Sequence, residues 1–338
     1  MSLRVGITGY GLAGRYFHAP LLKGCGYEVA AVLTSNSTRA AQVLEDFPDA
    51  VVVSTMHELL SQRLDLVIVA SANIVHAEQA IAALEAGIPT VIDKPMGRDF
   101  SETQRIIDVA SQKGVPVSTF FNRRWDSDAL TIKKVLESGV LGEIHRMDSR
   151  FERFRPEVNT QSWRENMSAQ DGGGQLLDLQ PHLISTAIDW FGNAQLVTAT
   201  VKSIRGAADD DAVLVLRHDS GVNSYLSASA VVGAPGPRIR ILGSKGALVI
   251  NELDPQEALL RAGKFPEGGS WSEPTTSVAH IHRGDQVEEI VGEPGNYALF
   301  YLAVAAAITN GTPWPITNED ALLVAQIIDQ ARKIGTDV

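Results

Sequence analysis

Residues 4–121 alternate short β-branched segments with amphipathic helical segments, and this alternation constrains the fold more than any other feature of the chain. The predicted strands are RVGIT, EVAAVLT, AVVVS, LDLVIVAS, PTVID and VPVSTFF. Helical stretches that end on glycine separate them, among them HAEQAIAALEAG and FSETQRIIDVASQKG. Strands that alternate with helices form a parallel sheet with helices on both faces. The sequence therefore predicts a doubly wound α/β domain.

The pattern changes after residue 122. A predicted helix near residues 125–138 leads into longer strand-like runs joined by turn signals, which favour antiparallel pairing. We expect loop or irregular structure across residues 251–295, which are rich in Gly, Pro and Glu, and then closing helices near 296–309 and 318–333. A chain of 338 residues is long enough for about two domains. We place them at residues 1–121 and 122–338.

Charge and cysteine content exclude several classes of protein. The 29 Lys and Arg residues against 40 Asp and Glu give a formal net charge of −11, and no basic cluster marks a nucleic-acid surface. The single cysteine, Cys25, cannot form an internal disulfide, which fits a reducing compartment. The sequence has neither a signal-peptide pattern nor an apolar run of about 18 residues. We expect a soluble, cytoplasmic protein that binds neither nucleic acid nor membrane.

The segment GYGLAG, residues 9–14, lies where the first predicted strand turns into a helix. In a dinucleotide-binding turn Gly9 makes the tight turn, Gly11 lets the backbone approach a pyrophosphate, and Gly14 lets helix and strand pack closely. An ordinary tight turn is the alternative, but the position between strand and helix favours the cofactor. We expect the whole segment to bind a dinucleotide at the helix N-terminus, including Tyr10, Leu12 and Ala13.

The residues after the second predicted strand favour NADP over NAD. An NAD-binding domain usually has a carboxylate there, which accepts from the ribose hydroxyl and repels a 2′-phosphate. This chain instead continues with Thr34, Ser35 and, after three more polar residues, Arg39. Hydroxyl groups and a guanidinium suit a phosphate. The same residues could also cap the next helix, with Ser37 accepting from its first turn.

Polar residues stand at the C-terminal ends of the other predicted strands, where ligands bind in open α/β sheets. These residues are Ser71, Asn73, Asp93, Lys94 and Asn122. His76 allows two interpretations. It could contact the cofactor, or it could open the following helix with its ring on the surface.

Lys94 immediately precedes Pro95, which cannot extend a strand and favours an extended or turn conformation at Lys94. The ammonium group is therefore expected to point out of the sheet toward the cofactor crevice. Far along the chain, GGGQLLDLQPHL places Asp178 and His182 four residues apart near a helix start marked by Pro181. Helical projection puts this pair opposite the apolar face of its helix.

These three side chains suit the oxidation of a secondary alcohol. A histidine can take the hydroxyl proton, a carboxylate can fix its tautomer, and a lysine can stabilise the developing alkoxide. A solvated Asp–His pair and a metal site are the alternatives. No further His, Cys or Asp residues stand at zinc spacing, so we expect no metal.

The motifs GYGLAG, DKP, NRRWD and GGGQLLDLQPHLI together resemble the Gfo/Idh/MocA family, named for glucose-fructose oxidoreductase and inositol dehydrogenase, over essentially the whole chain. The resemblance implies an N-terminal Rossmann domain and a C-terminal α+β domain with a large, mainly antiparallel sheet. The open face of that sheet often forms a homodimer interface in the family. The resemblance also assigns catalytic roles to Lys94, Asp178 and His182.

Two departures from the family pattern stand out. Asp93 replaces the usual Glu before the lysine, which keeps the charge but shortens the reach, and SAN at residues 71–73 replaces a Thr-Pro-Asn type sequence. The segments NRRWD and RFRPEV further resemble NADP-dependent scyllo-inositol dehydrogenases. The same resemblance implies that Trp163 and Arg164 lie near the nicotinamide.

The sequence thus predicts an NAD(P)-dependent dehydrogenase of a cyclic polyol or sugar, with an inositol as the favoured substrate. A sugar-derivative or carbonyl reductase and a non-catalytic dinucleotide sensor are the alternatives. Candidates for substrate hydroxyl contacts are Arg153, Arg155 and Asn159, although arginines in such a loop can equally face solvent. We also expect a homodimer or higher homo-oligomer, because the second domain has too few helices to cover both faces of its sheet.

Overall fold

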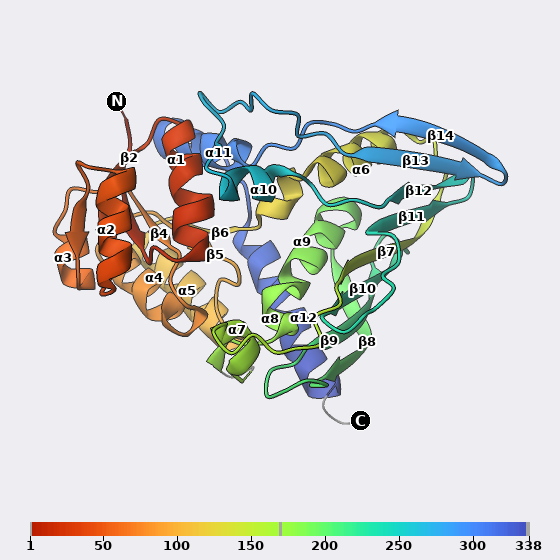
Figure 1. Ribbon diagram of the computed structural model, residues 1–338, viewed down its shortest axis with the longest axis horizontal. Helices are drawn as coiled ribbons and strands as arrows, with labels where there is room; N and C mark the ends of the chain where they lie inside the picture. Colours follow the sequence, from red (N-terminus) through yellow and green to blue (C-terminus); the bar gives the residue numbers. More distant parts are fainter. Residues whose placement is uncertain (1, 169–170, 336–338) are drawn as a thin grey trace. The chain divides into compact units, whose positions relative to one another are not determined.

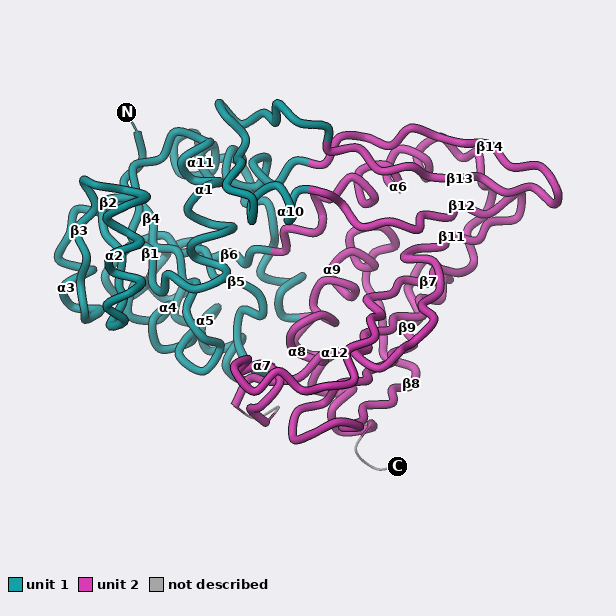
Figure 2. Tube along the Cα trace, viewed as in Figure 1, with its two compact units in different colours: residues 1–120, 256–274, 296–322 teal, residues 121–255, 275–295, 323–338 magenta. Residues whose placement is uncertain are grey.

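The computed structural model of the protein describes residues 2–168 and 171–335, and these residues form two compact units (Figure 2). The first unit contains the chain up to Phe120 together with Gln256–Pro274 and Asn296–Leu322. The second contains Phe121–Pro255, Thr275–Gly295 and the chain from Leu323 onward. The division therefore differs from the single boundary expected between residues 121 and 122. Two later segments return to the first unit, where the Tyr27 hydroxyl donates to the Tyr301 carbonyl oxygen at 2.6 Å.

The sheet of the first unit is parallel, and its strands follow the order β3-β2-β1-β4-β5-β6 (Figure 1). Its strands are β1 (Arg4–Thr8), β2 (Glu28–Leu33), β3 (Val51–Val53), β4 (Leu66–Val69), β5 (Thr90–Asp93) and β6 (Val117–Phe120). The chain starts in the middle of the sheet and winds outward in both directions, and the central strands are buried on both faces. The predicted doubly wound α/β domain is confirmed.

The helical elements of the first unit are η1 (Gly14–His18), α1 (Ala19–Gly24), α2 (Ser37–Asp46), α3 (Met56–Leu60), η2 (Asn73–Val75), α4 (His76–Glu85), α5 (Phe100–Lys113), α10 (Gln256–Arg261) and α11 (Ala298–Asn310). Some of them, such as α5 and α3, begin at side chains that cap them. At α5, the Asp99 carboxylate accepts from the Glu102 N–H at 2.7 Å, and Gly114 ends the helix with a φ of +64°. At α3, Thr55 and Glu58 form a capping box.

The sheet of the second unit is mainly antiparallel, as predicted, with the strand order β14-β13-β12-β11-β7-β10-β9-β8 (Figure 1). Only the neighbours β7 and β10 run parallel among the described residues. The strands are β7 (Ile144–Glu152), β8 (Ala194–Lys202), β9 (Asp211–His218), β10 (Asn223–Ser229), β11 (Ile239–Gly243), β12 (Gly246–Ile250), β13 (Val278–Arg283) and β14 (Gln286–Val291). Residues 251–295 were expected to be irregular, and this expectation is wrong because α10, β13 and β14 lie within them. Their many Gly, Pro and Glu residues obscured two short strands at the edge of the sheet.

Helices cover one face of this sheet. The helical elements of the second unit are η3 (Asn122–Trp125), α6 (Ser127–Ser138), α7 (Trp163–Asn166), α8 (Gln175–Asp178) and α9 (Gln180–Phe191), and α12 (Asn318–Gly335) crosses the division between the units. Helices α8 and α9 pack against β9 and β10, and α9 also against β7. In β9, the alternating residues Ala212, Leu214 and Leu216 are fully buried, whereas Val213 and Val215 are partly exposed.

The opposite face of this sheet contains charged side chains that form ion pairs. The Asp148 carboxylate is fully buried there and accepts from Arg146 Nε at 2.8 Å and from Arg240 Nε at 3.0 Å. The Arg146 guanidinium also lies 4.4 Å from the centre of the Tyr225 ring. This face therefore combines an ion-pair network with apolar side chains that are partly exposed.

Candidate active site

Two of the three glycines in residues 9–14, Gly9 and Gly14, occupy positions that no larger residue could take. Gly9 has a φ of +83°, and a Cβ atom there would lie 2.7 Å from the Ser71 Cα. A Cβ atom at Gly14 would lie 2.1 Å from the Gly9 carbonyl oxygen, so helix and strand meet without room for a side chain. Gly11 has more space, and its nearest neighbour is the Arg39 guanidinium at 3.5 Å from the Cβ position. The turn thus has the geometry that close approach to a pyrophosphate requires.

The side chains around this turn differ in exposure. Tyr10 points into the core, where its hydroxyl donates to Asp46 at 2.8 Å and burial raises the pKa of Tyr10, so that only its backbone can contact a ligand. Leu12 is exposed and Ala13 is half-buried. Polar contacts from the Tyr10 side chain to a cofactor are therefore excluded.

The residues after β2 form a short polar turn. Thr34 is buried and its hydroxyl accepts from the Asn36 N–H, whereas Ser35 and Arg39 are exposed. The N-cap of α2 is Asn36, which accepts from the Arg39 N–H at 3.0 Å, and not Ser37 as expected. Because Asn36 supplies the capping oxygen, Ser37 is the first residue of the helix itself. The guanidinium of Arg39 lies beside Gly11, so this charge is next to the glycine turn.

Ser71 and His76 meet at the C-terminal end of β4. The Ser71 hydroxyl donates to Gln79 Oε1 at 2.7 Å, and this oxygen also accepts from Thr8 at 2.6 Å. The His76 ring is fully buried, with Nε2 3.2 Å from the Ser71 carbonyl oxygen and Nδ1 3.0 Å from that of Pro95. The interpretation of His76 as a surface residue is therefore wrong, because its ring links the ends of β4 and β5. Asn73, also buried, begins η2.

Asp93 and Lys94 end β5, and the Lys94–Pro95 peptide bond is cis. Both side chains are partly exposed. His18 approaches Asp93 from η1, with 3.6 Å between Nε2 and Oδ1, which is an ion-pair distance rather than a hydrogen bond. Burial alone would raise the pKa of Asp93, but the interaction with His18 and the charges of Lys94 and His76 outweigh it and lower the pKa to about 2. A stable carboxylate therefore lies beside the lysine.

In the second unit, three consecutive glycines lead to the Asp–His pair. Gly172 and Gly174 have φ angles of +97° and +92°, and a Cβ atom at Gly173 would lie 2.1 Å from the Met167 carbonyl oxygen. A Cβ atom at Gly174 would lie 1.8 Å from Asp209 Oδ2. Each glycine is thus required by backbone conformation, by close approach, or by both. The triple-glycine segment is a tight turn that presents α8.

Asp178 and His182 belong to two successive helices. Asp178 ends the short helix α8, whereas His182 lies in the first turn of α9, which contains Pro181 as predicted. The helix start expected close to Asp178 is confirmed, but the expectation that one helix contains both residues is wrong, because Leu179 separates α8 from α9. The side of α9 expected to face away from the core is also buried, since Ser185 there accepts from Arg124 Nε at 2.9 Å. His182 itself is 8% exposed.

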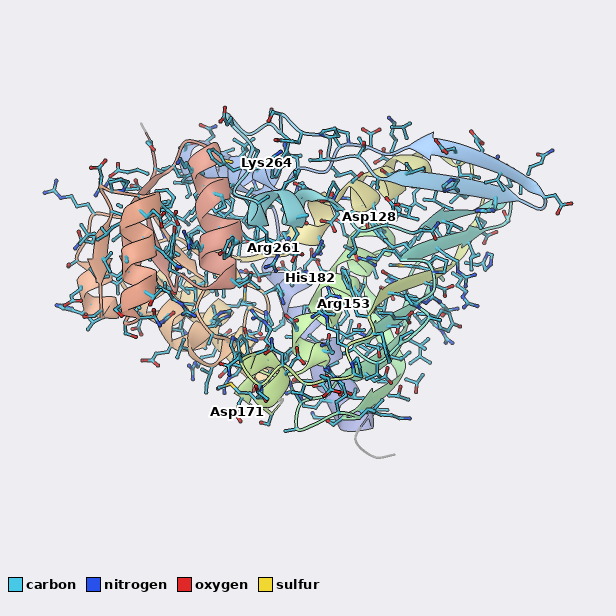
Figure 3. The ribbon with its side chains drawn as sticks, viewed as in Figure 1. Asp128, Arg153, Asp171, His182, Arg261 and Lys264 are labelled. Atoms are coloured by element: carbon cyan, nitrogen blue, oxygen red, sulfur yellow. The ribbon has the colours of Figure 1, made fainter. Side chains whose placement is uncertain are left out.

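The surroundings of the pair contain several of the predicted residues. Arg164, on α7, places Nε 3.2 Å from Asp178 Oδ1 and stacks over the Trp163 ring at 4.5 Å. The centre of the His182 ring lies 6.3 Å from that of Phe151, at the end of β7. Figure 3 marks His182 on α9 and Arg153 just beyond β7; Arg153 is partly exposed.

The remaining predicted residues lie at the surface or in the other motifs. Arg155 and Asn159 are exposed, and the Asn159 amide oxygen accepts from the Gln161 N–H at 3.0 Å. Asn122 is buried at the start of η3 in the second unit. Asn159 thus has a local role in its own loop.

The loop between β8 and β9 contains residues that the sequence analysis missed. Arg205 donates to the Arg155 carbonyl oxygen at 2.5 Å and pairs with Glu165 and Asp210 at 3.3 and 3.0 Å. Asp209 accepts from the Leu176 N–H at 2.7 Å. Arg205 and Asp209 therefore hold the segment that contains Arg164 and the glycine turn against the loop between β8 and β9. The only signal in the sequence was the unusual run of three aspartates at residues 209–211.

The sequence analysis also missed His18 and Tyr301 beside Asp93. Both are fully buried, and His18 Nδ1 lies 2.5 Å from the Tyr301 hydroxyl. His18 stands four residues after Gly14, but Tyr301 is distant in sequence and could not be connected to it. Among the described residues, no group of three His, Cys, Asp or Glu side chains could hold a metal ion, and no helix is long and apolar enough to cross a membrane.

Comparison with known proteins places the chain in a family. Residues 3–121 match the Gfo/Idh/MocA profile described as "Oxidoreductase family, NAD-binding Rossmann fold", and residues 133–333 match the one described as "Oxidoreductase family, C-terminal alpha/beta domain". The chain is 36% identical to the Bacillus subtilis scyllo-inositol 2-dehydrogenase (NADP(+)) IolW, over 98% of this chain and 93% of that protein. It is 35% identical to the uncharacterized oxidoreductase YdgJ of Escherichia coli, over 97% and 95% of the two chains.

A solved structure gives the same result. The Bacillus subtilis oxidoreductase YvaA superposes with a TM-score of 0.89 and 34% identity, over 99% of this chain and 97% of that one. Both domains and nearly the full length therefore correspond to one group of proteins. The chain belongs to the Gfo/Idh/MocA family of oxidoreductases and contains an NAD-binding Rossmann domain.

Proposed function

We propose that this oxidoreductase is an NADP-dependent dehydrogenase that interconverts a secondary alcohol of a cyclic polyol or sugar with the ketone, and that an inositol is its substrate. The observation that carries the proposal is the Asp–His pair at the triple-glycine turn, together with a lysine held beside an ionised Asp93 in the dinucleotide-binding unit. The 36% identity to a scyllo-inositol 2-dehydrogenase supports the substrate class.

Each of the three side chains has one role. The nicotinamide, when bound at the glycine turn, would supply the acceptor for the hydride that leaves the alcohol carbon. His182 takes the hydroxyl proton, and Asp178 orients His182 and stabilises its charged form. The ammonium group of Lys94, next to Asp93 in the chain, stabilises the developing alkoxide. In the reverse direction His182 returns the proton to the ketone oxygen.

The dinucleotide fits the first unit at the glycine turn. Gly9 and Gly14 allow the tight turn and the close packing, and Gly11 leaves room for a pyrophosphate next to the helix N-terminus. Ser71, Asn73, His76 and Asn122 are proposed to shape the nicotinamide end, and Trp163 and Arg164 to adjoin it. Only the backbone of Tyr10 is proposed to take part.

NADP is proposed over NAD because the turn after β2 has hydroxyls and a guanidinium where a carboxylate would repel the 2′-phosphate. Arg39 is exposed and lies beside Gly11, so it can reach a phosphate on the adenosine ribose. Thr34 is the weaker of the hydroxyl candidates, since it is buried and its oxygen accepts within the turn, whereas Ser35 is exposed.

The test is reduction of NADP⁺ in the presence of scyllo-inositol, myo-inositol and pyranose sugars, followed by the absorbance of the reduced nicotinamide. We expect turnover with an inositol. Reduction of ketosugar derivatives with no inositol oxidation would favour the sugar-derivative reductase instead. A protein that binds NADP⁺ but turns over no polyol, sugar or ketone would be a sensor, and the proposal would then fail.

We further propose a homodimer or higher homo-oligomer that acts in the cytoplasm. The face of the large sheet opposite α8 and α9 has partly exposed Val213 and Val215 and exposed Tyr225 beside the ion-pair network of Asp148, and such a mixed surface suits association. The single Cys25 fits a reducing compartment. A monomeric mass by light scattering at micromolar concentration would contradict the association.

A further inference from the structure

His18 is turned into the core by an irregular stretch of helix. The π-helical turn η1 (Gly14–His18) precedes α1, and Pro20 in the first turn of α1 has no N–H to continue the regular hydrogen-bond ladder. Single π-turns of this kind occur where a helix must redirect a side chain. The result is a histidine with no solvent exposure behind the end of β5.

Both nitrogens of the His18 ring face polar partners from other elements. Nδ1 lies 2.5 Å from the Tyr301 hydroxyl on α11, and Nε2 lies 3.6 Å from Asp93 Oδ1 on β5. Burial raises the pKa of Tyr301 well above its usual value, so its hydroxyl keeps its proton and can donate to Nδ1. The remaining proton of a neutral ring is then on Nε2 and points toward the carboxylate. The opposite tautomer would direct a lone pair at Asp93, which is unfavourable.

We propose that His18 and Tyr301 are positioning residues: the chain from the Tyr301 hydroxyl through His18 to Asp93 holds this carboxylate in place next to Lys94. The inference rests on the proposed function, in which Lys94 stabilises an alkoxide. Tyr301 and His18 have no access to solvent and contact no substrate, so they act only through Asp93.

The charges around the chain are consistent with this role. Asp93 is faced by His18 from η1, by His76 from α4 and by its neighbour Lys94, and their combined effect outweighs the burial of the carboxylate. Burial lowers the pKa of His76, so this ring tends to be neutral and contributes less than the lysine. Around Tyr301 lie Tyr27 and Cys25, and burial raises the pKa of both, which leaves these groups uncharged at neutral pH. Asp93 and Lys94 are thus the charged pair of this cluster.

Tyr301→Phe removes the donor to His18 and keeps the ring, which packs against Phe120 and Phe300 at 5.6 and 5.2 Å. Without this donor His18 no longer has to keep its proton on Nε2, and the support for the Asp93 carboxylate weakens. We expect kcat to fall about tenfold with KM and nucleotide affinity unchanged, since one buried hydrogen bond is worth about this factor.

Tyr27→Phe is the matched control. Tyr27 is buried in the same cluster, 5.9 Å from the Tyr301 ring, but its hydroxyl donates to the Tyr301 carbonyl oxygen and not to the chain that ends at Asp93. Both variants lose one buried hydroxyl, so a merely structural role predicts similar changes in both. A loss of kcat at unchanged KM in Tyr301→Phe alone supports positioning, and equal losses in both variants overturn it.

Nitrogen-15 NMR of histidine-labelled protein tests the chain without any turnover. In the unmodified protein we expect His18 to have an unprotonated Nδ1 and a protonated Nε2, assigned by the loss of its signals in His18→Gln. A proton on Nδ1 would overturn the proposal. This measurement needs no substrate, so it separates a failure of the positioning chain from a failure of the proposed polyol chemistry.

Discussion

Two largely buried carboxylates, one in each unit, have pKa values shifted in opposite directions. The pKa of Asp93 is lowered to about 2, whereas burial raises that of Asp209 to about 6. Asp93 faces His18, Lys94 and His76, while Asp209 is faced mainly by the Leu176 N–H and by the charge of Arg332. Burial opposes ionisation at both sites, so the partners decide the direction. The groups that face Asp93 outweigh its desolvation, whereas the Leu176 N–H and the charge of Arg332 do not outweigh the desolvation of Asp209.

The difference indicates two kinds of support for a candidate active site. Asp93 supplies charge to its neighbour Lys94, and its ionisation is part of its role. Asp209 has a structural role, since it accepts from the N–H of Leu176 and packs against Gly174 at the start of α8. Variants at the first site should therefore change rates, and variants at the second should change stability and its dependence on pH.

The largest effect is expected from removal of the groups that act on substrate. Lys94→Ala and His182→Ala should each lower kcat by about a hundredfold or more, the usual range for positioned electrostatic and acid–base groups. Dissociation constants for the nucleotide should change little. His57→Ala on α3, an exposed histidine, is the control and should keep full activity. A fully active His182→Ala enzyme would refute the assignment.

The glycine turn allows a matched test of shape. Gly174 (φ +92°, ψ 163°) and Gly192 (φ +80°, ψ −166°) have similar backbone conformations that only glycine adopts easily. A Cβ atom at Gly174 would lie 1.8 Å from Asp209 Oδ2, whereas one at Gly192 has no neighbour within 4 Å. Gly192→Ala should therefore cost about 1–3 kcal/mol of unfolding free energy from backbone strain alone. Gly174→Ala should cost more and should also lower kcat.

Equal losses in the two glycine variants would show that contact with Asp209 is unimportant. Urea unfolding measures the difference directly. Gly174→Ala combined with Asp209→Ala gives a second check, because removal of the carboxylate should relieve the clash but not the backbone strain. The double variant should then resemble Gly192→Ala with an added loss of the Leu176 hydrogen bond.

The raised pKa of Asp209 gives a pH dependence with a definite sign. Between about pH 4 and 6 the folded protein holds a proton at Asp209 that the unfolded chain has released, so the contribution of this group to stability falls as pH rises. The total cost by pH 7 is at most about 3 kcal/mol for a shift of about two units. Asp209→Asn keeps one oxygen for Leu176 and removes the charge.

Urea unfolding at pH 5 and pH 7.5 is the measurement for Asp209. The unmodified protein should lose more stability over this range than Asp209→Asn does. Asp128, labelled in Figure 3, also has a pKa raised by burial to about 6, but it is present in both proteins and cancels in the comparison. Parallel pH profiles would mean that Asp209 is ionised throughout this range.

Local patterns in the sequence predicted much of the fold. All strands of the parallel sheet were identified, because buried β-branched runs between helices that end on glycine leave few alternatives. Lys94 and His182 could be named as candidates because each adjoins a proline, and Asp178 because it precedes His182 by four residues. The edge strands β13 and β14 were missed, since strands with polar, exposed positions lack a clear apolar pattern.

The supporting residues could not be predicted from sequence. His18 and Tyr301 are 283 positions apart and meet only because α11 returns to the first unit. Arg205 acts through carbonyl oxygens of Arg155 and Glu157, which have no signature in a sequence. Nor does a sequence indicate that His76 is buried, since a histidine before a helix is equally common at the surface. Contacts of this kind depend on tertiary structure, and no local pattern encodes them.

The smallest effect is expected at Arg39, a charge of the first unit that differs from Asp93 in being exposed. Its guanidinium lies 3.5 Å from the Cβ position of Gly11, close enough to reach a 2′-phosphate on a dinucleotide bound at the glycine turn. Because solvent and salt screen an exposed ion pair, its loss should cost only about 1–2 kcal/mol. Arg39→Ala should therefore raise KM for NADP about tenfold and leave KM for NAD unchanged. Adding salt should weaken NADP binding in the unmodified protein more than in the variant. A preference of the unmodified enzyme for NAD, or an equal loss for both nucleotides in Arg39→Ala, would refute the assignment of this residue to the phosphate.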